Sequence, residues 1–123
     1  MKFSDLSTDR ALDALVICTE SITNILKDEN FLDSIKTKLK REDIKSAAEL
    51  INLGAEKINT IVPLLLGAHR KDICSIIAAV NGQTVEDVLS QNVMKTVNEA
   101  RELLEDEEFI SFFGSVAGMG KSA

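Results

Sequence analysis

Apolar residues recur every three or four positions along almost the whole chain, and no segment shows the sustained alternation of apolar and polar residues typical of a β-strand. The first periodic segment is predicted to start near Thr8 or Asp9, either of which can cap a helix, and to end near Lys27. A second, shorter helix is predicted from Phe31 to about Lys40. The first helix is expected to bury one broad apolar face, which includes Leu12, Leu15, Val16, Cys18 or Thr19, Ile22, Ile25 and Leu26.

The strongest periodic signal lies in the middle of the chain, from about Glu42 onward, and predicts a long amphipathic helix. Gly54 weakens this helix, and Pro63 removes a backbone donor and crowds the preceding turn, so we expect a kink or break between Thr60 and Pro63. Gly67 is expected to close it. The apolar positions that define the helix are Ile44, Ala47, Ala48, Ile51, Ala55, Ile58, Val62 and Leu65.

Capping residues separate the helices predicted in the C-terminal half. A helix from about Arg70 is expected to end at Asn81, with Gly82 as its left-handed cap residue. Thr84 and Asp87 form a variant of the capping box, which predicts a short helix directly after them. That helix is expected to turn Val85, Val88 and Leu89 toward the core.

Two further helices and a tail complete the chain. The helix after Asn92 is expected to bury Val93, Val97, Ala100 and Leu104, and Asp106 is expected to cap a last helix over residues 107–113. Residues 114–123 contain three glycines and no periodicity, which predicts a disordered tail. The sequence therefore predicts an all-α protein with a single compact domain at 1–113. This domain has about five to six helices, a kinked or broken long central helix, and a flexible C-terminal tail at 114–123.

Composition favours one soluble domain and disfavours nucleic-acid binding. The 123 residues are 45% hydrophobic and 28% charged, and the net charge of −6 repels a phosphate backbone. The chain has no Trp and no Tyr on which bases could stack, and the basic residues of 36–45 are interleaved with acidic ones, which favours a solvated face. We therefore expect no nucleic-acid partner.

The sequence also predicts a cytoplasmic location without membrane contact. The longest nearly apolar run, Ile61–Ala68, is far shorter than the roughly 20 residues that span a bilayer. The first ten residues are too polar for a signal peptide. Cys18 and Cys74 each lie in an apolar stretch, so we expect buried free thiols, which fit a reducing compartment.

No motif in the chain predicts catalysis, a cofactor, a metal or a small-molecule ligand. Gly114–Ser122 resembles a P-loop, but its first glycine stands one place too early and no strand and helix frame it. His69 is the only histidine, so a metal site would need long-range convergence with a cysteine, and we expect a surface side chain at a helix start. The acidic run 105–108 lacks the spacing of a calcium loop and suits a helix N-terminus.

The aromatic cluster near the C-terminus is the predicted partner-binding site. Large aromatic side chains dominate interfaces because they bury much area at little entropic cost. The alternative, which the sequence leaves open, is that this cluster is the last turn docked in the core. The predicted contact residues are Phe109, Ile110, Phe112 and Phe113.

Residues 62–113 carry a series of helix and cap motifs whose order resembles that of the small helical tail assembly chaperones encoded by phages and prophages of Gram-positive bacteria. The remainder of the chain matches this family only in layout. The motifs are Pro63–Leu66, His69–Ile73, Ile76–Gly82, Thr84–Val88, Gln91–Asn92, Thr96–Ala100, Leu103–Glu108 and Phe112–Phe113.

The resemblance implies a non-enzymatic role in the assembly of long-tailed, siphovirus-type phages. Such proteins coat the aggregation-prone tape measure protein, help recruit tail tube subunits, and are absent from the mature virion. Coating a long chain needs many copies side by side, so we expect weak self-association. In the phage families that the chain resembles, a ribosomal frameshift near the end of the gene often makes a longer product, which makes Gly120 and Lys121 the candidate frameshift position. The alternative for this segment is a frayed end without a function. The alternatives are a helical DNA-binding regulator and a small helical regulatory subunit of an enzyme.

Overall fold

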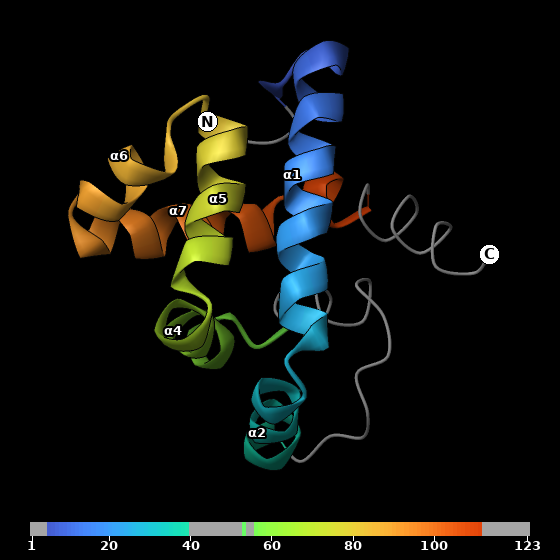
Figure 1. Ribbon diagram of the computed structural model, residues 1–123, viewed down its shortest axis with the longest axis vertical. Helices are drawn as coiled ribbons and strands as arrows, with labels where there is room; N and C mark the ends of the chain where they lie inside the picture. The colour runs from blue at the N-terminus through green and yellow to red at the C-terminus, as the bar shows by residue number, and fades with distance from the viewer. Residues whose placement is uncertain (1–4, 40–52, 54–55, 112–123) are drawn as a thin grey trace.

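A computed structural model describes residues 5–39, 53 and 56–111 of the chain (Figure 1). Within these residues the protein contains helices and no strands, which confirms the predicted all-α class. A further helical turn covers residues 107–111. The helices with defined bounds are α1 (Thr8–Lys27), α2 (Glu29–Leu39), α4 (Ile58–Ala68), α5 (Arg70–Asn81), α6 (Val85–Ser90) and α7 (Val93–Glu105).

The centre of the fold is the antiparallel pair of α1 and α5, which stand side by side in Figure 1 and form the most extensive helix contact. At one end of the pair the Arg10 guanidinium lies against Gly82. At the other end the Asn24 side-chain amide donates a 3.0 Å hydrogen bond to Asp72. α7 crosses behind α5, and α4, α6 and α7 all contact α5. α5 is therefore the core helix of the domain.

The apolar core draws on every helix. Burial of these side chains is the main force that holds the helices together, because each helix alone has only one apolar stripe to remove from water. α5 buries the most residues, on more than half of its circumference, as its contacts with α1, α4, α6 and α7 require. Its buried residues are Ile73, Cys74, Ile76, Ile77, Ala78 and Val80.

Caps mark the helix ends close to where the sequence predicts them. Ser7 caps α1, one residue before the predicted Thr8 or Asp9, because its hydroxyl accepts a backbone hydrogen bond. Gly82 has φ +68 and closes α5 in the predicted left-handed conformation. The capping box of Thr84 and Asp87 is formed, and the Asp106 carboxylate caps the turn over 107–111.

The central helix is broken earlier than expected. The break is at Lys57, with φ −122 and ψ 44, and α4 then continues without interruption through Pro63 to Ala68. Pro63 and the residue one turn before it, Asn59, are both exposed, so water can satisfy the Asn59 carbonyl that lacks an intrahelical donor. Most of the predicted 42–55 portion lies outside the described residues, as do the 113/114 domain boundary and the tail.

Candidate partner-binding surfaces

The predicted aromatic site is described only in part. Phe109 is 3% exposed and belongs to the core, and Ile110 is half-buried against the same core. Phe112 and Phe113, and the candidate frameshift residues Gly120 and Lys121, lie outside the described residues. Phe109 thus points inward, and contact of this cluster with a partner stays a prediction.

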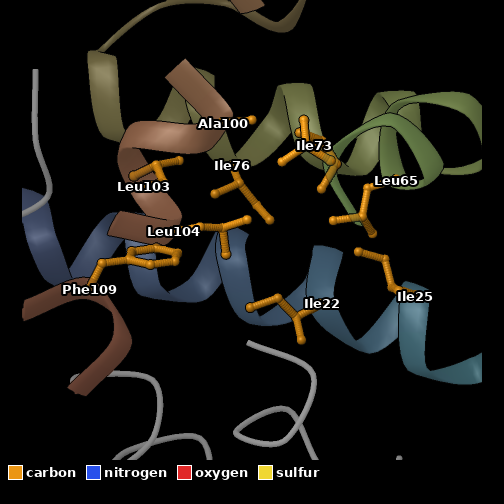
Figure 2. Close-up of a pocket in the computed structure, with 10 residues that line it drawn as sticks. Ile22, Ile25, Leu65, Ile73, Ile76, Ala100, Leu103, Leu104 and Phe109 are labelled. Atoms are coloured by element: carbon orange, nitrogen blue, oxygen red, sulfur yellow. The ribbon is translucent and has the colours of Figure 1, made fainter. Parts of the chain in front are cut away.

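Phe109 borders an apolar cavity of about 70 Å³ where α1, α4, α5 and α7 meet (Figure 2). Figure 2 shows the side chains converging on this space from all four helices and from the turn that carries Phe109. No polar side chain is among the described lining residues, so they present no acid, base or anion-binding group to the cavity. Lining it are Ile22, Ile25, Val62, Leu65, Ile73, Ile76, Ala100, Leu103, Leu104 and Phe109.

His69 connects two helix corners. It lies between α4 and α5, and its side chain is only 10% exposed. The prediction of a surface side chain is therefore wrong, and the predicted place at the start of a helix is right. Nε2 lies 2.8 Å from an Asp28 carboxylate oxygen, and Nδ1 lies 2.9 Å from an Asp72 oxygen. The ring also packs edge-on against Phe31, with ring centroids 4.9 Å apart. His69 thus fastens the α1–α2 corner to the start of α5.

Both ring nitrogens of His69 are engaged by carboxylates from different parts of the chain, Nε2 by Asp28 and Nδ1 by Asp72. The Phe31 backbone N–H and the His69 side chain both donate to Asp28, and these two bonds lower the pKa of the Asp28 carboxyl. The arrangement suits a structural role for His69, since neither ring nitrogen is left to contact another group.

Of the two carboxylates that contact His69, one has a sequence signal and the other has none. Asp72 follows His69 by three residues, a spacing that brings side chains together at the start of a helix. Asp28 precedes His69 by 41 residues, and only the fold brings the two together.

Exposed apolar side chains form two surfaces that the sequence pattern did not separate from the core. On α1, Leu12, Val16 and Ile17 are 51%, 69% and 44% exposed. At the α6–α7 corner, Leu89, Val93 and Met94 are also exposed. The expected inward positions of Leu12, Val16, Leu89 and Val93 are therefore wrong. Helices α1 and α6–α7 bury one side against α5 and leave these apolar residues on another side.

The two cysteines are buried free thiols, as predicted. Burial raises the pKa of the Cys18 thiol to about 12 and also raises the pKa of Cys74. A thiol with a raised pKa is a poor nucleophile, because the thiolate is the reactive form. Both cysteines therefore serve as small apolar core residues.

Residues 5–39, 53 and 56–111 hold no group of three or more His, Cys, Asp or Glu side chains able to bind a metal ion. None of the described helices has both the length and the apolar character needed to cross a bilayer. No family model matches the chain, and no match was found among curated proteins or solved structures.

Proposed function

We propose that this protein is a non-enzymatic phage tail assembly chaperone. In this role it binds the tape measure protein, keeps it soluble, and helps recruit tail tube subunits in the cytoplasm of the host bacterium, without entering the mature virion. The observation that carries the proposal is the exposure of large apolar side chains on the outer side of α1 and at the α6–α7 corner. Patches of this kind on an otherwise charged domain are typical of protein-binding sites.

The chemistry of these surfaces fits an elongated helical client. Apolar residues on a helix surface bind the apolar stripe of another helix, and the net charge of −6 keeps the complex soluble. The motif order over 62–113 resembles that of the chaperone family, which supports the same role. A DNA-binding regulator is less favoured because α5, which starts at Arg70 and Lys71, is the core helix and cannot lie in a DNA groove.

The test is coexpression with the long helical protein encoded immediately downstream in the same genome. We expect the downstream protein to remain in the soluble fraction and to co-elute with this chain, whereas alone it sediments. Sedimentation of this chain alone is expected to give an average mass that rises with concentration above 13.4 kDa. A downstream protein that stays insoluble in the presence of the folded chain would contradict the proposal.

The frameshift at Gly120 and Lys121 is tested by the coding DNA. The proposal requires a slippery run at these codons and an open frame in the −1 register. If either is missing, the longer product is not made at this position.

A further inference from the structure

The outward side of α1 combines apolar and acidic side chains in a fixed pattern. Leu12 and Val16 lie one helical turn apart, about 6 Å along the axis, and Ile17 adjoins Val16. Asp13 precedes Val16 by three residues and Glu20 follows it by four, so both carboxylates border Val16 on the helix surface. We call these five residues the α1 ridge.

The two carboxylates of the α1 ridge have no partner within the described part of the chain. Asp13 and Glu20 are exposed and make no ion pair or hydrogen bond there. Asp9, one turn before Asp13, is likewise exposed and makes none among the described residues. Arg10, the basic residue nearest in sequence, is directed instead toward Gly82 at the end of α5. The ridge therefore presents apolar surface with uncompensated negative charge along it.

The ridge is also held rigidly. The buried residues of α1 include Ala14, Cys18 and Ile22, which fix one side of the helix in the core. The ridge residues alternate in sequence with these buried positions or directly precede them, and their side chains are exposed. A partner that binds here meets a preorganised surface, which lowers the entropic cost of binding.

We propose that the α1 ridge binds an amphipathic helix whose apolar stripe is bordered by lysine or arginine. This inference rests on the proposed function, because the helix is taken to be a segment of the client. The apolar stripe would cover Leu12, Val16 and Ile17, and the basic residues would pair with Asp13 and Glu20. A second copy of the same surface is disfavoured, because a two-fold contact brings like charges together.

A pair of synthetic peptides provides the first test. Both have about 18 residues, or five helical turns, and the same leucine stripe, but one carries lysine and the other glutamate beside the stripe. Fluorescence anisotropy with the full chain should show binding of the lysine peptide and at least tenfold weaker binding of the glutamate peptide. Raising the salt from about 0.05 M to about 0.5 M should weaken the lysine complex severalfold. Equal binding of both peptides would overturn the proposal.

Variants assign the binding to the ridge rather than to general charge. Leu12→Ser with Val16→Ser should weaken binding of the lysine peptide about tenfold or more. Asp13→Asn with Glu20→Gln should weaken this binding roughly fivefold and reduce its salt dependence. Glu102→Gln with Glu105→Gln removes the same charge from exposed positions of α7 and is the matched control.

The control pair should leave the affinity for the lysine peptide within twofold of that of the parent chain, a difference too small to mark a contact residue. Circular dichroism and thermal unfolding establish that each variant is folded. Ridge variants that are folded and bind as tightly as the parent, or a control pair that loses as much affinity as the ridge variants, would overturn the assignment.

The ridge and the proposed function fail in different ways. If the downstream protein is solubilised but the lysine peptide does not bind, the ridge proposal is wrong and the chaperone role stands. If the lysine peptide binds through the ridge but the downstream protein stays insoluble, the chaperone role is wrong and the ridge remains a site for a basic amphipathic helix.

Discussion

Phe109 is the residue for which the two interpretations of the C-terminal aromatic cluster predict different results. Replacing Phe109 by Ala removes a ring that is 3% exposed. The transfer free energy lost is about 3 kcal/mol, the upper end of the range for burying a large apolar side chain. The ring borders a cavity of about 70 Å³, so its neighbours already lack contacts on that side and cannot collapse fully. Undocking of the short turn 107–111 limits the loss. We expect about 3–4 kcal/mol.

Urea unfolding followed by circular dichroism measures this change. The urea midpoint should fall while the slope of the unfolding free energy against urea stays constant, and the melting temperature should drop by about 12–15 °C. Val93→Ala, at a side chain that is 68% exposed, is the control and should change stability by less than about 0.5 kcal/mol. A loss below about 1 kcal/mol for Phe109→Ala, at unchanged urea dependence, would refute the core assignment.

Three further predictions concern other described residues. His69→Ala removes the hydrogen bond to the partly buried Asp72 and should cost about 2 kcal/mol in urea unfolding at neutral pH. The folded-state pKa of Asp28 lies below its ordinary value, so its contribution to the free energy of unfolding is complete above the unfolded-state pKa and is lost as the pH falls through the folded-state pKa. His69→Ala should reduce the loss of stability with falling pH in this range. An unchanged pH dependence of stability would contradict the His69 contact. Gly82→Ala should destabilise by about 1–2 kcal/mol because φ is +68, whereas Gly67→Ala, with open space around its added methyl inside α4, should stabilise by about 0.5–1 kcal/mol; the same sign for both would refute the argument. Cys18 should react with a thiol reagent at pH 8 only as fast as the domain opens, because burial raises its pKa to about 12, and rapid labelling of the native protein would contradict that burial.

The predictions that the structure confirms rest on local signals. Gly82, Thr84 and Asp106 were identified because a left-handed cap, a capping box and an N-cap each depend on residues within one or two turns. The break at Lys57 has no such signal. Pro63 is a misleading signal for a break. The cost of a proline inside a helix depends on whether the carbonyl that loses its donor faces water, and the Asn59 carbonyl of α4 does.

The surfaces could not be predicted because they depend on which side of a helix the fold covers. Almost every side of α1 carries apolar residues, so periodicity did not separate Cys18, which is buried, from Val16, which is exposed. The His69 cluster was missed for a related reason. Its Asp28 contact joins two corners that are distant in sequence, and no spacing rule encodes that pairing.

The cavity beside Phe109 also bears on how the domain responds to pressure. Empty internal space is lost when a chain unfolds, and the decrease in volume on unfolding, about 20–100 mL/mol, scales with that space without being equal to it. The apolar space between α1, α4, α5 and α7 contributes to this decrease. A larger apolar side chain that fills it without strain should therefore make the domain more resistant to hydrostatic pressure.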